Sequence, residues 1–322
     1  MLLATTSAFA VDPVPAANRI PVTISTTLTA PAADAMHMPT DVAVDAAGRV
    51  YVADGANDRI VVFRPDGGFE RAFSSIGEQK LNRPVGLCID TAGQLWIADS
   101  GNNRMLIVAP GGGAVTKIEV PPPEGGRPFE PTDIAVTPDG RRAYFTDSHN
   151  HRLGIRDNST GAISFTGRFG EALGQFRYPF MVAIAPDGYV YITDVVGARA
   201  QRLSPTDRWA GRVGEWGVEL GQLYRPKGLV IDGRGRVYIG DSSLGVIQVF
   251  DAHGGVVGVL TDATGRPQKF QHPMGLTFDA HGRLYVVELL ADRVAVLTLP
   301  PGFVPPTPTT RPTTRPAEER SQ

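Results

Sequence analysis

Six charged or polar side chains flank a proline that recurs along the chain, and their types could bind an anion, a metal ion or a polar ligand. They are Asp41, Arg83, Asp133, Arg225, Lys227 and His272. Carboxylates and imidazoles can hold metal ions or move protons, whereas guanidinium and ammonium groups pair with carboxylates and phosphates. Each stands one or two positions from its proline, where the copies of the surrounding pattern differ from one another. We interpret these positions as a candidate binding site, with simple drift of loop ends as the alternative.

The proline marks six copies of one pattern along the 322 residues of the chain. The prolines are Pro39, Pro84, Pro131, Pro179, Pro226 and Pro273, at steps of 45, 47, 48, 47 and 47 residues. A glycine stands nine residues after each of them. A constant period of this length indicates a repeat architecture in which every copy is one supersecondary unit.

Each copy contains short runs of strand length. The run after the proline is almost continuously apolar, as in VGLCID after Pro84, which predicts a strand buried on both faces. An Asp-x-x-Gly turn follows in most copies, and its aspartate is interpreted as a turn former rather than a ligand. A second strand with one aromatic residue and a third strand come next, as in LWIAD and MLIV, and a weaker fourth strand precedes the next proline.

An acid ends the second strand of every copy, and in five copies an arginine follows five residues later. The acids are Asp54, Asp99, Asp147, Asp194, Asp241 and Glu288. The arginines are Arg59, Arg104, Arg152, Arg199 and Arg293, and the fifth copy has Val246 instead. Because a single active site does not need five copies, we predict that these pairs belong to the scaffold.

Four short strands per copy and six copies predict an all-β fold, a six-bladed β-propeller of four-stranded blades. The last copy supplies three strands, and the β-branched N-terminal segment Arg19–Ala30 should complete it and close the ring. Arg283–Leu299 could pass for a helix by itself, but alignment with the other copies favours strand–turn–strand. The expected division is a signal-like or disordered segment over 1–18, the propeller over 19–299 and a Pro/Thr-rich disordered tail over 300–322.

The copies resemble NHL repeats, from Pro39 to about Leu299. The resemblance rests on the P-x-[GD]-hydrophobic-A-hydrophobic-D run, the Y-[VI]-x-D strand end and the D-x-x-N-x-R turns of Asp54–Arg59 and Asp99–Arg104. The family contains protein-binding propellers, RNA-binding propellers and one enzyme, the peptidyl-hydroxyglycine amidating lyase. The resemblance therefore implies the propeller fold and leaves the function open.

The similarity to the amidating lyase can be examined residue by residue. In that enzyme, zinc-binding histidines directly follow the motif proline in several blades. The corresponding residues here are Thr40, Val85, Thr132, Phe180, Lys227 and Met274. None is a histidine, so a zinc site of that kind is not supported. Asp41 and Asp133, one position further on, match the lyase's calcium contact; we expect no cofactor, with calcium or zinc as the alternative.

Three other residues could do chemistry, and each has a plainer interpretation. His149 and His151 could bind one metal ion together, but two ligands do not make a site, and a solvated turn is preferred. Cys88, the single cysteine, lies in an apolar strand and is interpreted as a small buried core residue. The sequence contains no HExxH, GxSxG or P-loop pattern.

The composition of the chain limits the kinds of partner that it can bind. Lys and Arg number 31 and Asp and Glu 33, and this balance disfavours nucleic acid as a partner. No run reaches the ~18 apolar residues of a membrane span. The first residues end in Ala8-Phe9-Ala10, which resembles a signal-peptide cleavage pattern and favours a secreted or periplasmic protein, with the cytoplasm as the alternative.

These observations predict a non-enzymatic binding propeller that recognises a protein, peptide or glycan partner, or a small polar or anionic ligand, on its loop face. The alternative is a lyase or hydrolase with its site at the mouth of the central channel, using Asp41 or Asp133 with or without a metal ion. Arg225 and Lys227 have no acid at the motif positions of the neighbouring blades. We therefore expect these two residues to attract the anionic group of a ligand.

Overall fold

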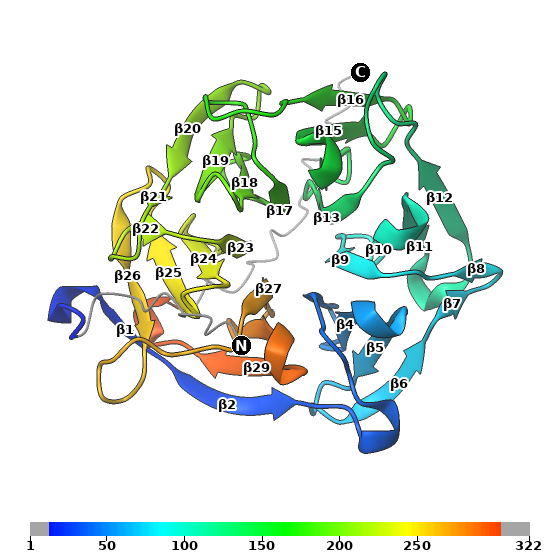
Figure 1. Cartoon of the computed structure of the whole chain (residues 1–322). Coiled ribbons are helices and arrows are strands. Elements are labelled where there is room, and N and C mark those ends of the chain that lie inside the picture. The colour runs from blue at the N-terminus through cyan, green and yellow to red at the C-terminus, as the bar shows by residue number, and fades with distance from the viewer. Residues whose placement is uncertain (1–12, 304–322) are drawn as a thin grey trace, which may run out of the picture.

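The computed structural model describes residues 13–303, which form six β-sheets arranged in a ring around a central channel (Figure 1). The innermost strand of each sheet begins at the motif proline or just after it. The described part of the chain contains no α-helix, only strands and short 3₁₀ turns. The chain is therefore a six-bladed, all-β propeller, as the sequence predicts.

Each blade is an antiparallel sheet, and its strands run in chain order from the channel outward. Blade one contains β3 (Asp41–Val44), β4 (Val50–Asp54), β5 (Arg59–Phe63) and β6 (Phe69–Phe73). Blade two contains β9 (Pro84–Ile89), β10 (Leu95–Asp99), β11 (Arg104–Val108) and β12 (Val115–Glu119). Blade three contains β13 (Pro131–Val136), β14 (Arg142–Asp147), β15 (Arg152–Asp157) and β16 (Ile163–Thr166). Blade four contains β17 (Pro179–Ile184), β18 (Val190–Asp194), β19 (Arg199–Leu203) and β20 (Trp209–Val213). Blade five contains β23 (Pro226–Ile231), β24 (Val237–Asp241), β25 (Val246–Phe250) and β26 (Val256–Thr261). Blade six contains β27 (Pro273–Phe278), β28 (Leu284–Glu288) and β29 (Arg293–Thr298).

Smaller elements connect the blades. Two short strand pairs are β7 (Ser75–Ile76) with β8 (Gln79–Lys80), and β21 (Glu215–Trp216) with β22 (Gln222–Leu223). The 3₁₀ turns are η1 (Ala16–Asn18), η2 (Ala32–Asp34), η3 (Gly55–Asn57), η4 (Ser100–Asn102), η5 (Pro110–Gly112), η6 (Ser148–Asn150), η7 (Leu289–Ala291) and η8 (Pro301–Phe303). The segment over residues 283–299 is strand, turn and strand (β28, η7, β29), which confirms the prediction made for it.

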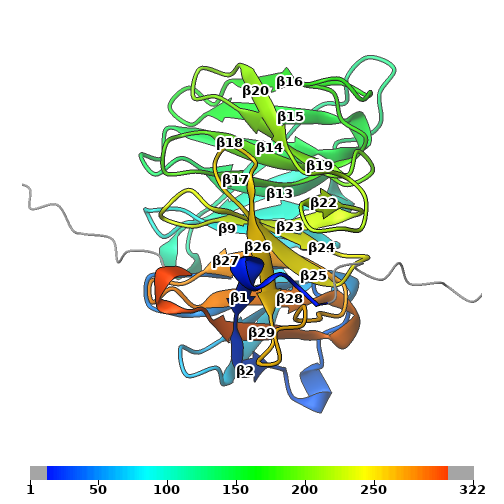
Figure 2. The ribbon, with the colours of Figure 1, turned by 90° about the vertical axis from the view of Figure 1, so that its left-hand side faces the viewer.

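An N-terminal strand closes the ring. β2 (Thr23–Leu28) pairs antiparallel with β29, with Thr23 opposite Thr298 and Leu28 opposite Val294. This confirms the predicted outer strand of blade six for the later part of the predicted segment Arg19–Ala30, but not for its first residues. A second N-terminal strand, β1 (Arg19–Pro21), pairs parallel with β26 of blade five, which the sequence analysis did not predict. Both run along the outer edge of the ring (Figure 2). The segment over residues 19–28 is thus bonded to two consecutive blades.

The packed part of the chain extends slightly beyond the expected limits of 19 and 299. Val14 is fully buried and packs with Leu244, Val246 and Val259 of blade five. At the other end, the ring of Phe303 lies 4.2 Å from the guanidinium carbon of Arg236. The signal-like Ala8-Phe9-Ala10 and the greater part of the Pro/Thr-rich tail lie outside the described residues.

The acid at the end of each second strand is a buried scaffold residue. Asp99 is fully buried, and its Oδ2 lies 2.7 Å from Nε of Arg104. Its Oδ1 accepts the backbone N–H of Asn82, two residues before Pro84, the motif proline of the same blade, at 2.8 Å. The other four acid–arginine pairs have N–O distances of 2.7–3.2 Å. The pairs therefore hold the turn and the approach to the inner strand, as predicted.

In blade five the buried acid is stabilised without an arginine. Asp241 is fully buried, and its two oxygens accept four backbone N–H groups, from Tyr224, Arg225, Ser243 and Leu244, at 2.6–3.1 Å. Backbone donors thus replace the missing guanidinium. Val246, at the arginine position, is fully buried among apolar side chains.

The aspartates of the Asp-x-x-Gly turns are turn formers, as predicted. Oδ1 of Asp90 accepts the backbone N–H groups of Ala92 and Gln94, and its Oδ2 accepts the indole N–H of Trp96 at 2.9 Å. Each carboxylate therefore fixes one turn and the aromatic residue of the following strand.

Two further observations bear on the sequence predictions. Cys88 packs against the apolar core between blades two and three, as expected, but it is only partly buried because it also borders the channel. Burial of the sulfur nevertheless raises the pKa of its thiol to about 12. Among residues 13–303, none of the helical turns has the length and apolar character needed to cross a membrane.

Candidate functional site

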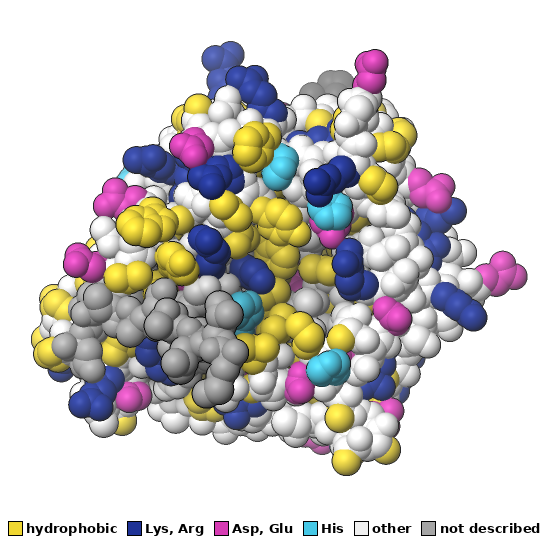
Figure 3. Space-filling model, in the orientation of Figure 1, with side chains coloured by type: hydrophobic (Ala, Val, Ile, Leu, Met, Phe, Trp, Pro, Cys, Tyr) yellow, Lys and Arg dark blue, Asp and Glu magenta, His cyan; other side chains and the backbone are white. Residues whose placement is uncertain are grey.

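The residues before the motif prolines form the rim of one end of the channel, which we call the mouth. Several of them have left-handed backbone conformations: Met38 (φ 49°), Arg83 (φ 47°), Tyr178 (φ 93°) and His272 (φ 60°). Non-glycine residues seldom adopt such angles, and they persist where neighbouring contacts hold them. Figure 3 views this face, and hydrophobic side chains fill the centre of the ring with basic and histidine side chains around them.

Lys227 and His272 come together at the mouth, from the neighbouring blades five and six. Nζ of Lys227 lies 3.4 Å from Nε2 of His272 and 5.4 Å from the ring centre of Phe180. Burial lowers the pKa of the lysine. Burial, and then the charge of Lys227, lower the pKa of His272 to about 4, so the imidazole is neutral near pH 7. Within residues 13–303, no carboxylate forms an ion pair with Lys227.

Arg225 stands beside this pair but is bound locally. Its guanidinium lies 4.7 Å from the ring centre of Tyr224 and donates to the carbonyl of the same residue. Like Lys227, it has no ion pair with a carboxylate in the described part of the chain. The two cations that the sequence analysis singled out are thus unneutralised by acidic side chains of the rim.

The third predicted cation, Arg83, is neutralised by a residue that was not in the predicted site. Its Nη2 lies 2.9 Å from Oε1 of Glu130, whose other carboxylate oxygen is 2.8 Å from Nε2 of His149. Burial raises the pKa of Glu130, while His149 and Arg83 oppose that rise. Burial also raises the pKa of Tyr178, whose hydroxyl interacts with Glu130. We name Arg83, Glu130, His149 and Tyr178 the acid–base cluster.

The position of His149 in the turn after the second strand already indicated that it lies near the rim. In every blade the turn after the second strand returns to the segment before the proline, and in blade three the N–H of Ser148 donates to the carbonyl of Glu130. A histidine next to that contact must therefore lie close to the rim. The neighbouring His151 turns away and packs its ring 5.1 Å from that of Phe169, so the two histidines do not converge on one point.

Asp41 and Asp133 lie deeper than the rim, where their blades approach the next inner strand. Both are buried, at 4% and 5% exposure. Oδ2 of Asp41 accepts the N–H of Leu87 in blade two at 2.7 Å, and Oδ2 of Asp133 accepts the N–H of Val182 in blade four at 2.8 Å. The two carboxylates occupy the same structural role in blades one and three, and neither pairs with Arg83.

Burial dominates the electrostatics of these two acids. It raises the pKa of Asp41 to about 7, against the opposing effect of the Leu87 N–H. It raises the pKa of Asp133 well above its usual range, and the charge of Asp41 adds to that rise. Because burial disfavours the charged form of both carboxyls, and the charge of Asp41 acts on Asp133, they cannot both ionise at low cost, so one holds a proton over part of the neutral range.

Beyond the two acids, on the side away from the mouth, the inner strands line a cavity of about 250 Å³. Asp41, Asp133 and Met181 border it, and most of the remaining lining is apolar, with Cys88 and Thr277 facing the space. The six predicted residues therefore divide into a cationic part at the mouth and an acidic part within the channel.

The residues at the lyase's zinc positions tie neighbouring blades together. The hydroxyl of Thr40 donates to the carbonyl of Val85, and that of Thr132 to the carbonyl of Phe180, both at 2.8 Å. Among the residues that the structure describes, no three histidine, cysteine or acidic side chains converge as metal ligands. Asp41 and Asp133 do not fit a calcium site well, since each commits one oxygen to a backbone N–H.

Comparison with known proteins agrees with this architecture. The family model for the NHL repeat matches residues 36–63 and 81–108, the inner three strands of blades one and two. Protein SUPPRESSOR OF QUENCHING 1, chloroplastic, from Arabidopsis thaliana is 27% identical over 150 residues, which cover 39% of this chain and 14% of that protein. The match thus involves a small part of that relative.

Solved structures of two enzymes have the same fold. A catalytically inactive virginiamycin B lyase from Staphylococcus aureus with quinupristin superposes with a TM-score of 0.64 and 16% identity, over 85% of this chain and 99% of that chain. A gluconolactonase from Xanthomonas campestris gives a TM-score of 0.63 and 18% identity, over 83% and 87%. Identities this low establish the fold alone. The chain is a six-bladed β-propeller. Its first two blades carry NHL repeats.

Proposed function

We propose that this propeller is a ligand-binding protein whose channel mouth takes an anionic group of a protein, peptide or glycan partner. The observation that carries the proposal is the Lys227 ammonium, half-buried beside a neutral His272 and a phenyl ring. A cation removed from water without a carboxylate partner is unfavourable by itself. An anionic ligand group would supply the missing partner and would gain from the reduced exposure to water.

The distribution of charge around the rim favours binding of the ligand on one side of the mouth. The acid–base cluster satisfies Arg83 internally, so this side offers little net attraction to an anion. Arg225 adds a second cation next to Lys227, and Phe180 offers an apolar surface beside it. The anionic group should therefore sit over blades five and six, with the rest of the ligand across the hydrophobic centre of the mouth.

The test uses two defined probes, N-acetyl-aspartyl-glutamate as an acidic peptide and galacturonate as an acidic sugar. Binding is measured by calorimetry across a salt series from about 0.05 to 0.5 M. The double variant Arg225→Gln/Lys227→Gln should lose about tenfold or more in affinity and most of the salt dependence. Arg208→Gln, an exposed arginine in an outer turn of blade four, is the matched control. Equal affinity and equal salt slope in wild type and double variant would remove the mouth as the binding site.

A second candidate function is acid–base catalysis at the same mouth, as in a lyase or hydrolase. It is favoured by the acid–base cluster, where Oε2 of Glu130 lies 2.8 Å from Nε2 of the His149 imidazole. A histidine held by a carboxylate is a common general base. The discriminating measurement is turnover of ester, lactone and cyclic depsipeptide substrates by wild type and His149→Gln. Activity that depends on His149 would favour the enzyme, and elemental analysis of the purified protein would detect a stoichiometric metal ion.

We also propose that the chain is exported, on the basis of the Ala8-Phe9-Ala10 pattern. Fractionation of cells that express the full chain, with N-terminal sequencing of the product, tests this. An intact N-terminus in the cytoplasmic fraction would contradict it.

A further inference from the structure

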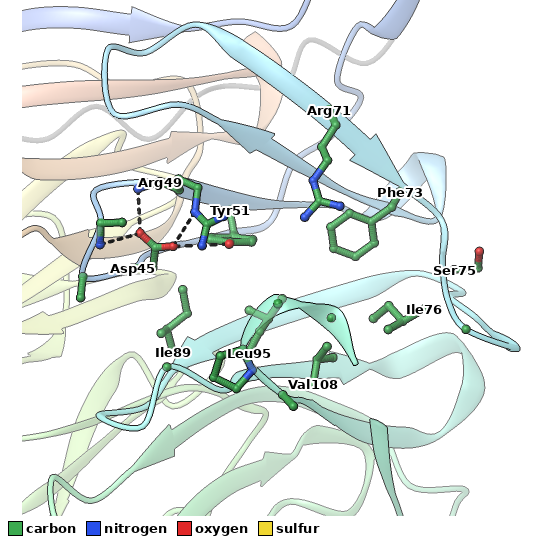
Figure 4. Close-up of a pocket in the computed structure, with 18 residues that line it drawn as sticks. Asp45, Arg49, Tyr51, Arg71, Phe73, Ser75, Ile76, Ile89, Leu95 and Val108 are labelled. Carbon is green, nitrogen blue, oxygen red and sulfur yellow. Dashed lines mark hydrogen bonds and ion pairs between the residues drawn. The ribbon is translucent and has the colours of Figure 1, made fainter. Parts of the chain in front are cut away.

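A cavity of about 600 Å³ lies between blades one and two (Figure 4). It is formed around the Asp45 turn, which follows the inner strand of blade one, and is thus at the opposite end of that strand from the mouth. We call it the interblade pocket. It shares no lining residue with the mouth, so any role for it is separate from the function proposed above.

The pocket exists because blade two has an unusual outer turn. In three other places the turn after the third strand, or the segment in its place, reaches back and covers the preceding blade. Asp207 of blade four bonds to Arg142 of blade three at 2.5 Å. The carbonyl of Ala252 in blade five accepts the hydroxyl of Tyr191 in blade four at 3.0 Å. The carbonyl of Gly302, after blade six, accepts a hydrogen bond from Nη1 of Arg236 in blade five at 2.8 Å.

In blade two the corresponding turn is Pro110-Gly111-Gly112-Gly113, which carries no side chain beyond the proline. A Cβ placed on any of these three glycines would meet no atom within 4 Å. Correspondingly, neither Arg49 nor Tyr51 of blade one bonds to blade two within residues 13–303. The space that other blades fill is left open here.

The two walls of the pocket differ in character. The wall from blade two is apolar, with Ile89, Leu95 and Val108. Ile76, in the connection between the blades, continues the apolar surface. Figure 4 shows these side chains opposite the strands of blade one.

The wall from blade one carries the charge. Arg49 is held by Asp45, with Nε 2.8 Å from Oδ2, and the same carboxylate receives the hydroxyl of Tyr51 at 3.4 Å. Arg71, on the edge strand β6, is more than half exposed and lies over the ring of Phe73 at 5.4 Å. Arg71 has one contact to an acid, 3.6 Å to its neighbour Glu70, which does not line the pocket. Two guanidinium groups and one carboxylate give the lining a net positive charge.

We propose that the interblade pocket binds a small amphipathic anion, with an apolar chain or ring against blade two and a carboxylate head at Arg71. The volume lies within the range of about 300–1,000 Å³ typical of small-molecule sites. An apolar floor excludes a fully hydrophilic ligand, since its polar groups would lose their water without replacement. The exposed guanidinium of Arg71, whose acidic contact Glu70 lies outside the pocket lining, favours an anionic head over a neutral one.

Decanoate serves as the probe, and its binding is followed by displacement of the fluorescent dye 1-anilinonaphthalene-8-sulfonate and by calorimetry. The full chain should bind decanoate at one saturable site and bind decanol more weakly. Arg71→Gln should weaken decanoate binding about tenfold, and Arg71→Lys should retain much of it. Ala47→Trp, at an exposed position of the lining, should block the pocket and weaken both ligands.

Two controls make the result decisive. Arg208→Gln removes an exposed arginine of an outer turn elsewhere and should leave decanoate binding unchanged. Melting curves of all variants establish that they are folded, as expected for changes at exposed positions. Equal decanoate affinity in wild type, Arg71→Gln and Ala47→Trp would overturn the proposal. So would decanol binding as tightly as decanoate, since the anionic head would then be irrelevant.

Discussion

The carboxylate of Asp41 occupies the space that a side chain on Gly275 would need. Gly275 lies in blade six, which precedes blade one around the ring, and a Cβ on it would also come within 2.6 Å of Cα of Asp41. Blade two repeats the arrangement, because a Cβ on Gly86 would stand 2.7 Å from Cα and 3.0 Å from Oδ1 of Asp133. Each buried acid of the channel thus follows a blade with glycine at the same position.

Gly275→Ala should therefore destabilise the propeller, by about 1–3 kcal/mol, because the methyl group displaces the Asp41 carboxylate from its bond to Leu87. Urea unfolding measures the loss. Gly113→Ala is the matched control, since its φ of −75° suits alanine and its surroundings are empty. A double variant with Asp41→Gly should recover part of the loss. Equal stability of the Gly275 and Gly113 variants would contradict the steric argument.

The raised pKa values of the two channel acids predict a specific pH dependence. In the folded protein the pKa of Asp41 is about 7, against about 4 for an ordinary aspartate, so the folded state binds more protons than the unfolded state between these values. Stability should consequently fall as pH rises from about 4 to 7, by up to about 1.4 kcal/mol per pH unit for one proton. Asp133, whose pKa is also raised by burial, should add to this fall in stability.

Melting temperatures of wild type and Asp41→Asn at pH 5, 6, 7 and 8 measure this effect. The amide cannot ionise, so the variant should gain relative to wild type as pH rises. Asp187→Asn, at an exposed turn, is the control and should run parallel to wild type. A constant difference between wild type and Asp41→Asn across this range would show that the acid stays ionised in the folded protein.

In blade five, replacing a residue with the arginine found in the other five blades should lower stability rather than raise it. Restoring the arginine of the other blades through Val246→Arg should destabilise the protein, by roughly 2–4 kcal/mol. Val246 is fully buried, and Asp241 already accepts four backbone N–H groups, so the new charge would lack a partner. Val246→Ile is the apolar control. A more stable Val246→Arg variant, in thermal or urea unfolding, would mean that the guanidinium can displace those backbone donors.

The mouth offers a spectroscopic prediction that needs no ligand. Burial is the larger cause of the lowered pKa of His272, and the charge of Lys227 is the second. Lys227→Gln should therefore raise the pKa of His272 from about 4, while leaving it below 6.5 because the burial remains. The proton resonances of the imidazole, followed by NMR titration, report this pKa. An unchanged value would mean that the ammonium does not face the ring.

The repeated prolines made the fold predictable, because six copies at nearly one spacing are compatible with few repeat folds. The acid–arginine pairs recur with the prolines and mark the same turn in each blade. The closing strand β2 was also predictable, since blade six lacked one strand and the N-terminal segment had a strand pattern. The parallel strand β1 was not, because three residues carry no pattern of their own. Val14 likewise gave no signal before its neighbours in blade five were known.

The sequence indicated the positions of the candidate site residues but not the contacts between them. The pattern identified Lys227 and His272 separately, but only the closed ring brings the two side chains together. Glu130 and His149 belong to one blade, and the recurring contact between the second-strand turn and the segment before the proline could have joined them. The burial of Asp41 and Asp133 depends on glycines in the preceding blades, so it appears only when the order around the ring is considered. The interblade pocket results from the glycines in the outer turn of blade two. A search of the sequence for reactive residues does not detect such a feature.

The N-terminal strand in blade six has a consequence for how the protein is made. Thr23 pairs with Thr298, so the first strand of the ring has no partner until nearly the whole propeller has left the ribosome. Until then β2 has unpaired edges, which are prone to associate with other chains. Ring closure joins residues far apart in sequence and should be a late and slow event in folding. Once β2 is paired with β29, the ring has no open seam, so the release of this one strand would reopen blade six.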